Sequence, residues 1–496
     1  MAGNIMILGT ASGTGKSLLA AGLCRILKQD GYRVAPFKSQ NMALNSFITP
    51  DGLEMGRAQA MQAQAAGIEP SVLMNPILLK PQSDTGSQVI INGRVWGVMS
   101  AREYFACKQT LIPQVLESYA KLRESCEVVV LEGAGSPAEI NLNQQDMVNM
   151  GLAAMVDAPV LLAGDIDRGG VFASLYGTMM LLEQEHRSRV KGLIINKFRG
   201  DVEILRPGLS QLEELTGVPV MGVVPMLNVD IEEEDSLGLP EQGSAGSVLD
   251  IAVIRLPRIS NFTDFHPLEQ VEGVGVRYVD SVRKLGSPDL ILLPGTKSSI
   301  ADLAWLRQSG LEAALKKAAA AGTPLMGIGG GYQMLGRGLS DPQGIEGCHQ
   351  IAGMGLLPVE MVFHEQKART RVTGKILSPQ GFFAGLGGAA VEGYEIQTGT
   401  ITPGEGAVPL AQLADGGRDG VVLGNVMGTC LHGLFDHEEF TGALLGILLR
   451  RKGLEPSALQ AVDYHAYQEE QYDLLAAALR KSLDMEKIYR IIGEGA

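Results

Sequence analysis

A glycine-rich loop near the start of the chain has residue types suited to binding phosphate. Residues 9–17 read GTASGTGKS and lie between a predicted strand and a predicted helix. In such a loop, backbone N–H groups and the helix N-terminus bind phosphate oxygens, the lysine neutralises charge and the serine can ligate Mg²⁺. The first glycine stands one residue further from the lysine than in the strict P-loop pattern, and a fortuitous glycine-rich turn is the alternative. We expect ATP to contact Thr10, Ser12, Gly13, Thr14, Gly15, Lys16 and Ser17.

An acidic residue at the end of another apolar run is a candidate metal ligand. Glu132 follows the predicted strand 127–131. At the carboxyl end of a parallel strand beside the first βα loop, a carboxylate can hold Mg²⁺ directly or through water. We therefore expect Ser17 and Glu132 to share the metal, with a solvated strand-end acid as the alternative.

Two further segments concentrate polar side chains after apolar strands. Residues 37–46 and 80–88 are rich in amides, hydroxyls and charges. Such groups at strand ends suit a substrate with many carboxylates and amides, although ordinary loop polarity explains each segment alone about as well. The candidate substrate-binding residues are Gln40, Asn41, Asn45, Ser46, Ser83 and Asp84.

The elements that position these residues alternate between strand and helix. Short apolar runs and helix-like stretches follow one another, which indicates βαβ units and a parallel sheet. The alternation breaks at 231–247 and restarts at 250–255, without an internal repeat. We predict an α/β P-loop domain in 1–235, a linker in 236–249, a second α/β domain in 250–452 and a helical C-terminal extension in 453–496.

Composition limits the function classes. The 496 residues are 45% hydrophobic and 19% charged, which is far too apolar for a disordered chain. The net charge of −14 and the lack of a basic block argue against nucleic acid as the main ligand. Five scattered cysteines without a CxxC pair argue against disulfides and structural zinc. Without a membrane-length apolar segment or a basic leader, we expect a soluble cytoplasmic protein.

These motifs together resemble the cobyric acid synthase family. That family fuses a dethiobiotin-synthetase-like P-loop domain to a class I glutamine amidotransferase-like domain, which implies two doubly wound α/β domains. The similarity covers nearly the whole chain, and it rests on the loop spacing and on the motifs at 37–46, 56–60, 83–88, 132–141, 164–172, 196–201 and 293–297.

The resemblance implies a reaction and further site residues. The family amidates the b, d, e and g carboxylates of adenosylcobyrinic acid a,c-diamide with ATP, through acyl phosphates and with ammonia from glutamine. Lys16, Lys38 and Asp146 are implied to take part in catalysis, and Asn196 and Lys197 match the adenine-side motif. For Asp146, helix capping or a solvated helix acid is the alternative.

The C-terminal half departs from the family at one decisive position. Residues 324–336 have the strand, elbow and helix shape on which class I amidotransferases carry a nucleophilic cysteine. Gly329 stands in its place, through a natural or an engineered change, so that no thiolate can form there and we expect an inactive glutaminase. The resemblance implies that Gly295, Gly330 and Gln333 line the glutamine pocket.

His432 matches the catalytic base of the amidotransferase, with a structural histidine as the alternative. Many class I enzymes place an orienting glutamate two residues later, where this chain has Leu434, so no third member is visible. Cys430 lacks an elbow, and we interpret it as a small core residue. Gln397 and His266 stand where we expect His and Asp.

Two other functions remain open at this stage. One is cobyrinic acid a,c-diamide synthase, which shares both domain types and the chemistry. The other is a P-loop ATPase switch with a non-catalytic amidotransferase-like binding domain.

Overall fold

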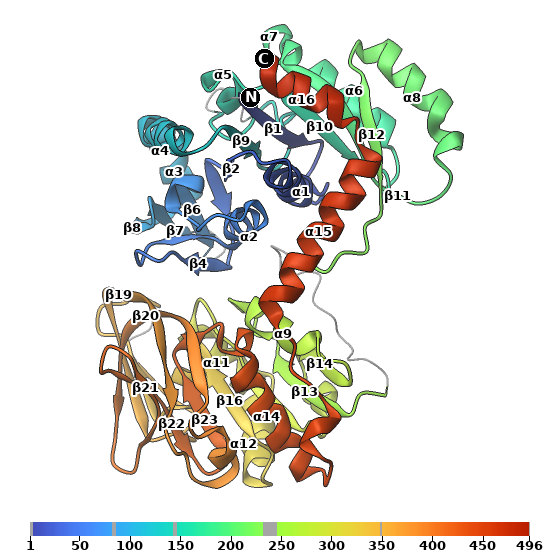
Figure 1. Ribbon diagram of the computed structural model, residues 1–496. Helices are drawn as coiled ribbons and strands as arrows, with labels where there is room; N and C mark the ends of the chain where they lie inside the picture. The colour runs from blue at the N-terminus through green and yellow to red at the C-terminus, as the bar shows by residue number, and fades with distance from the viewer. Residues whose placement is uncertain (1–2, 82–85, 142–145, 232–245, 348–349, 496) are drawn as a thin grey trace. The chain divides into compact units, whose positions relative to one another are not determined.

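The computed structural model describes residues 3–81, 86–141, 146–231, 246–347 and 350–495. The chain forms two compact units (Figure 1). Unit 1 comprises Met1–Ala43, Leu53–Glu232 and Gln468–Ala496, and unit 2 comprises Leu44–Gly52 and Glu233–Tyr467. Both units are built from parallel strands with intervening helices, which confirms the predicted α/β class.

A parallel sheet forms the centre of unit 1. Its strand order is β12-β11-β10-β1-β9-β2, and each neighbouring pair runs parallel. The carboxyl ends of its strands therefore meet at one edge, where the P-loop and Glu132 lie. The strands are β1 (Gly3–Gly9), β2 (Val34–Phe37), β9 (Val128–Glu132), β10 (Val160–Asp165), β11 (Val190–Phe198) and β12 (Val220–Pro225).

Helices cover the sheet of unit 1. One hydrophobic core joins β1 to three helices, through residues such as Ile5, Leu19, Leu475 and Ile488. Those three helices are α1 (Lys16–Gln29), the part of α15 (Tyr464–Ser482) that lies in unit 1, and α16 (Met485–Glu494). The others are α2 (Arg57–Ala66), α3 (Ala101–Cys107), α4 (Ile112–Ser125), α5 (Met150–Met155), α6 (Val171–Leu181), α7 (Gln184–Ser188) and α8 (Val202–Thr216).

A second, smaller sheet of unit 1 carries the polar segments that follow β2. Its strand order is β3-β6-β7-β8. The strands are β3 (Gln40–Met42), β6 (Ile77–Pro81), β7 (Gly86–Ile91) and β8 (Arg94–Ser100), and the short β5 (Glu54–Gly56) precedes α2.

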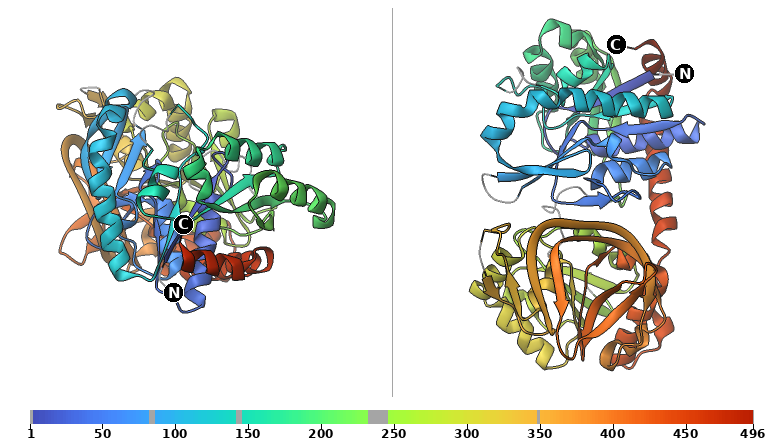
Figure 2. Two further views of the ribbon diagram at one scale, coloured as in Figure 1. Left: turned by 90° about the horizontal axis from the view of Figure 1, so that it is seen from above. Right: turned by 90° about the vertical axis from the view of Figure 1, so that its left-hand side faces the viewer.

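Unit 2 combines a parallel half-sheet with antiparallel strands. The order β14-β13-β15-β16-β23 is parallel and continues antiparallel through β22, β21 and β19. Figure 2 shows the long strands β19 and β20 side by side, and β20 also pairs with β24. The strands of this sheet are β13 (Leu249–Ile254), β14 (Val274–Val279), β15 (Leu290–Leu293), β16 (Leu325–Ile328), β17 (Gly338–Ser340), β18 (Gln350–Ala352), β19 (Val359–Ile376), β20 (Ala390–Pro403), β21 (Val408–Leu413), β22 (Arg418–Leu423), β23 (Val426–Thr429) and β24 (Leu431–His432).

The helices of unit 2 connect and flank these strands. They are α9 (His266–Glu269), α10 (Val282–Leu285), α11 (Ser299–Gln308), α12 (Leu311–Ala320), α13 (Gly330–Leu335) and α14 (Glu438–Arg451). The short strand β4 (Ser46–Ile48) belongs to this unit as well.

The division of the chain differs from the predicted boundaries in two places. The predicted extension 453–496 is split between the units inside α15, because the apolar face of its last part packs into the core of unit 1. Residues 44–52, predicted within the P-loop domain, belong to unit 2. Most of the predicted linker 236–249 lies outside the described residues.

Candidate functional site

The glycine-rich loop turns tightly between β1 and α1. Gly13 and Gly15 have positive φ values of 73° and 87°, a region in which glycine carries no steric cost. A Cβ on Gly15 would lie 2.3 Å from Nδ2 of Asn196, so a side chain there would displace the Asn196 amide. The loop ends directly at Lys16, the first residue of α1, as an anion site at a helix N-terminus requires.

Backbone carbonyl groups of the loop and of neighbouring segments hold the polar residues of the loop. Lys16 Nζ donates to the carbonyl oxygens of Ala11 (2.9 Å) and Gly135 (3.2 Å). Thr14 is buried and its hydroxyl donates to the Ala11 carbonyl, while the Thr10 N–H donates to Ala163. The Ser12 side chain is exposed.

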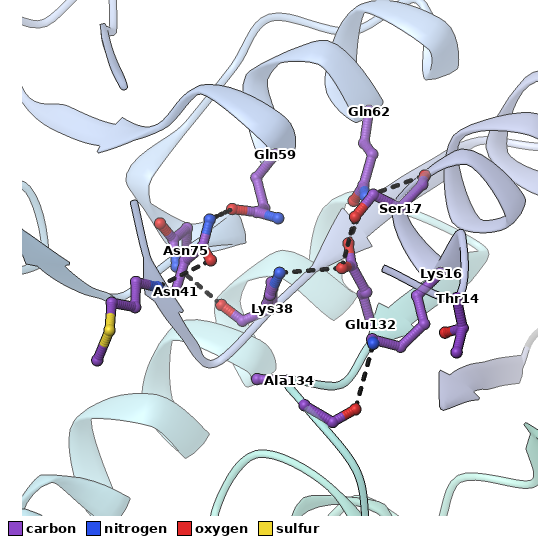
Figure 3. A network of polar contacts seen from close by, with 12 residues as sticks. Thr14, Lys16, Ser17, Lys38, Asn41, Gln59, Gln62, Asn75, Glu132 and Ala134 are labelled. Atoms are coloured by element: carbon purple, nitrogen blue, oxygen red, sulfur yellow. Dashed lines mark hydrogen bonds and ion pairs between the residues drawn. The ribbon is translucent and has the colours of Figure 1, made fainter. Parts of the chain in front are cut away.

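Glu132 is the centre of a buried polar network at the end of β9. Figure 3 shows Ser17, Lys38 and Gln62 converging on its carboxylate. Ser17 Oγ and Lys38 Nζ lie 2.8 and 2.9 Å from Oε1, and Gln62 Nε2 donates to Oε2 at 2.6 Å. Burial favours the neutral acid, but the charge of Lys38 and these hydrogen bonds outweigh it and hold the pKa of Glu132 below its ordinary value.

Strand pairing explains why these groups meet. β2 and β9 are parallel neighbours with Phe37 opposite Leu131, so Lys38 and Glu132 leave the sheet side by side. Gln62 comes from α2 and carried no signal in the sequence, because its partner lies 70 residues away. A hydroxyl and an ionised carboxylate fit Mg²⁺ that also binds phosphate oxygens. The described ranges contain no group of three or more His, Cys, Asp or Glu side chains that could hold a metal ion.

Asn196 and Lys197, at the end of β11, donate hydrogen bonds to backbone carbonyls of the phosphate loop. Asn196 Nδ2 donates to the Thr14 carbonyl at 2.8 Å. Lys197 Nζ donates to the Gly13 carbonyl at 2.6 Å and pairs with Asp165 at 3.1 Å. Both residues therefore lie at the expected nucleotide end of the sheet.

The candidate substrate residues do not form one group. Gln40 and Asn41 lie on β3, where Asn41 Nδ2 donates to Gln59 Oε1 at 3.0 Å and Gln40 accepts from the Tyr104 hydroxyl. Asn45 and Ser46 belong to unit 2. Ser83 and Asp84 lie outside the described residues.

Asp146 organises the start of α5. Its Oδ1 accepts from the N–H groups of Val148 (2.9 Å) and Asn149 (2.8 Å), and its Oδ2 accepts from Gly151 (2.8 Å). Asp146 lies three residues before the N-cap residue Asn149 and accepts from a free N–H group of the first turn, which is close to the helix-capping role that the sequence left as the alternative to a catalytic one. The same contacts explain why α5 begins at Met150.

The predicted elbow is present in unit 2. β16 ends at Ile328, α13 begins at Gly330, and Gly329 between them has φ 52° and ψ −115°. A Cβ on Gly329 would lie 3.0 Å from Nε2 of His432. A side chain at this position would therefore point at the imidazole, as a nucleophile must point at its base.

His432 has a buried carboxylate partner that the sequence did not reveal. Its Nδ1 lies 2.7 Å from Oδ2 of Asp264, and Oδ1 of Asp264 accepts from the Gly433 N–H at 3.1 Å. Asp264 keeps the proton on Nδ1, which leaves Nε2 as the proton acceptor facing Gly329. The two residues are 168 positions apart, so only folding brings them together.

The implied glutamine-pocket residues surround this elbow. A Cβ on Gly295 would lie 3.1 Å from Cε1 of His432, and one on Gly330 would lie 2.6 Å from Cγ2 of Thr296. Gln333 Oε1 accepts from the Ser299 hydroxyl at 2.7 Å. The backbone at Gly295 therefore closely approaches the imidazole of His432.

Three other residues stand out in the sequence of this unit. Cys430 is buried, and burial followed by the charge of Asp419 raises its thiol pKa well above the ordinary value, which fits a core residue. His266 pairs through Nδ1 with the Tyr464 hydroxyl at 2.7 Å. The side chain of Gln397 lies outside the described residues.

Comparison with known proteins matches each unit to a known domain family. Residues 5–238 match the CobQ/CobB/MinD/ParA nucleotide binding domain, and residues 250–440 match the CobB/CobQ-like glutamine amidotransferase domain. The chain is 54% identical to the cobyric acid synthase of Lachnoclostridium phytofermentans, and the alignment covers 100% of both chains. The chain belongs to the cobyric acid synthase family.

Further relatives match this chain over nearly its full length. The cobyric acid synthase of Ruminiclostridium cellulolyticum is 55% identical over 100% of this chain and 98% of its own. That of Photorhabdus laumondii is 52% identical over 98% of this chain and 97% of its own.

Within the described ranges, no helix has both the length and the apolar character needed to span a bilayer.

Proposed function

We propose that this chain catalyses the ATP-dependent amidation of the b, d, e and g carboxylates of adenosylcobyrinic acid a,c-diamide to give adenosylcobyric acid. The observation that carries the proposal is the meeting of Ser17 and Lys38 on the buried carboxylate of Glu132, beside a phosphate loop. Membership of the cobyric acid synthase family over the full chain supports the substrate class.

In the proposed reaction, a substrate carboxylate attacks the γ-phosphorus of ATP and forms an acyl phosphate and ADP. Ammonia then attacks the acyl carbon and expels phosphate. The protein mainly positions the reactants and neutralises charge. Lys16 exchanges its two carbonyl partners, Ala11 and Gly135, for phosphate oxygens, while Lys38 stays beside Glu132. Ser17 and Glu132 would hold a Mg²⁺ ion, which would supply further charge neutralisation.

The amidotransferase unit is proposed to bind glutamine but not to hydrolyse it. In a complete site, His432 would accept the thiol proton through Nε2, with Asp264 holding the imidazole. Gly329 offers no thiol to deprotonate. Free ammonia is therefore the expected nitrogen donor for the chain as it stands.

The test is incubation with ATP, Mg²⁺, ammonium and the corrinoid a,c-diamide, followed by mass spectrometry of the corrinoid. We expect stepwise mass changes that stop at the product amidated on all four carboxylates. ATP turnover that ignores the corrinoid would contradict the proposal in favour of an ATPase switch. Efficient amidation of the a and c carboxylates of cobyrinic acid would favour the a,c-diamide synthase instead.

A further inference from the structure

A short segment of the N-terminal sequence is built into the amidotransferase unit. Residues Leu44–Gly52 belong to unit 2, whereas the chain on both sides of them belongs to unit 1. The segment is not a surface connection, because Asn45, Ser46 and Thr49 are each at most 1% exposed. It follows β3, which carries the candidate substrate residues Gln40 and Asn41.

The segment holds the turn that carries Asp264. Asn45 Oδ1 accepts from the backbone N–H of Asn261 at 2.9 Å. Asn261 has a positive φ of 54° and directly precedes the 3₁₀ turn Phe262–Phe265 that contains Asp264. A residue other than glycine keeps such a conformation only when its surroundings hold it. The Asn45 contact therefore helps to fix the carboxylate that orients His432.

The same segment supports the other side of the imidazole. The side-chain amide nitrogen Nδ2 of Asn261 donates to the Tyr394 hydroxyl at 2.9 Å. The ring centre of Phe47 lies 6.2 Å from that of Tyr394. The Tyr394 ring stacks on His432, with centres 5.5 Å apart and planes 20° apart. Tyr394 is also the direct partner of His432 in the pairing of β20 with β24.

The guanidinium group of Arg371 holds residues 44–52 against β19. The guanidinium carbon of Arg371 lies 5.0 Å from the ring centre of Phe47, and Arg371 Nε donates to the Ile48 carbonyl at 3.4 Å. Arg371 lies opposite Tyr394 in the pairing of β19 with β20. A row of cross-strand neighbours thus runs from Arg371 through Tyr394 to His432, and Phe47 contacts its first two members.

We propose that residues 44–52 are a positioning strap for His432. The strap holds Tyr394 against one face of the imidazole and holds the turn of Asp264, so that Nε2 faces the elbow. Because the strap continues directly from β3, the ammonia-producing site is complete only while this piece of the synthetase sequence is seated in unit 2. This inference rests on the proposed role of His432 as a base.

The test uses the full chain with Gly329→Cys, which supplies the missing thiol. In that background, Phe47→Leu removes the ring that contacts Tyr394, Tyr394→Leu removes the stack on His432, and Tyr394→Phe removes only the hydroxyl bonded to Asn261. Phe382→Leu is the matched control, because Phe382 also lies in unit 2 and its ring centre lies 5.7 Å from the guanidinium carbon of Arg451. Glutamine hydrolysis, ammonium-dependent amidation and melting temperature are measured for each variant.

We expect Tyr394→Leu and Phe47→Leu to lower kcat for glutamine hydrolysis about ten- to hundredfold, as misplaced catalytic groups do. KM for glutamine and ammonium-dependent amidation should stay within about twofold, and Tyr394→Phe should recover part of the lost kcat because it restores the ring.

Three results would overturn the strap. An equal loss of kcat in Phe382→Leu, or a loss that only follows the melting temperature, would show a merely structural role. Unchanged kcat in Phe47→Leu and Tyr394→Leu would show that the segment does not act on His432. Failure of Gly329→Cys to hydrolyse glutamine would remove the role of His432 and the strap together, while ammonium-dependent amidation would still report separately on the synthetase reaction.

Discussion

At the scale of single residues, Gly329 lacks the thiol that glutamine hydrolysis would need, whereas the amidation reaction does not depend on that thiol. Gly329 occupies the elbow, its φ of 52° is typical of a nucleophile elbow, and His432 faces it with an acceptor nitrogen held ready by Asp264. In the proposed glutaminase site, the base and its orienting carboxylate are thus present, and the thiol is absent. The synthetase residues around Glu132 belong to the other unit and are unaffected by this change.

We therefore predict that the chain uses ammonium but not glutamine, and that Gly329→Cys restores glutamine-dependent amidation. The ring of His432 must move by a few tenths of an ångström, because a Cβ at residue 329 would lie 3.0 Å from its Nε2. Product formation with each nitrogen donor measures the effect. In the restored enzyme, His432→Gln should abolish glutamine use and Cys430→Ser should not. Glutamine hydrolysis at a normal rate by the unaltered chain would place the nucleophile elsewhere.

A second prediction at this scale concerns Lys16. Lys16→Ala should lower ammonium-dependent amidation by about 10²–10³, because phosphate charge in the transition state would lose its cation. Steady-state turnover with saturating ammonium measures this. Lys28→Ala, at the other end of α1, is the control and should keep near-normal turnover. If Lys16→Ala behaves like the control, the loop at 9–17 is not the phosphate site.

At the scale of elements, the strand that carries Tyr394 also carries an acid with an unusual proton affinity. Burial, followed by the charges of Asp419 and Asp415, raises the pKa of Glu395 on β20 to about 7. In the unfolded chain, the carboxyl returns to about 4.5. Because the folded state binds the proton more tightly, this group favours folding below about pH 4.5 and loses that contribution as pH rises to about 7.

The stability of unit 2 should therefore fall between about pH 5 and pH 7, and Glu395→Gln should flatten this part of the curve. Trp305 lies in unit 2, so that its fluorescence in a Trp96→Phe background reports urea unfolding of that unit. Glu392→Gln, an exposed position on the same strand, is the matched control. An unchanged slope in Glu395→Gln would show that another group titrates.

At the scale of the whole molecule, the chain from Gln468 onward is part of unit 1 rather than a separate extension. Leu475, Leu479 and Ile488 are completely buried in the core that contains α1. The approach is close: a Cβ on Gly22 would lie 2.2 Å from Cδ1 of Leu479. Glycine at residue 22 therefore lets α15 pack against α1.

Leu479→Ala should destabilise unit 1 by about 2–5 kcal/mol, because it leaves a cavity between α1 and α15. Urea unfolding followed by Trp96 in a Trp305→Phe background measures this, since Trp96 lies in unit 1. Leu474→Ala is the control on the same helix, because Leu474 is 47% exposed and its loss should cost less than about 0.5 kcal/mol. Equal effects of the two substitutions would contradict the packing of α15 in this core.

Local patterns were enough to predict several features of this protein. Strand and helix alternation predicted two α/β units, and the glycine-rich loop predicted a phosphate site at a helix N-terminus. The elbow around residue 329 was also readable, because strand, turn and helix are consecutive in the chain. These features depend on residues close together in sequence, where backbone geometry follows from residue type and spacing.

Other features were decided only by tertiary structure. Asp264 reaches His432 across 168 residues, Gln62 reaches Glu132 across 70, and Asn45 reaches Asn261 across 216. The sequence likewise predicted a separate extension at 453–496, but the core of unit 1 takes up its second part. No local pattern marks such partners, because a buried carboxylate or amide is selected by the groups that surround it after folding and not by its neighbours along the chain.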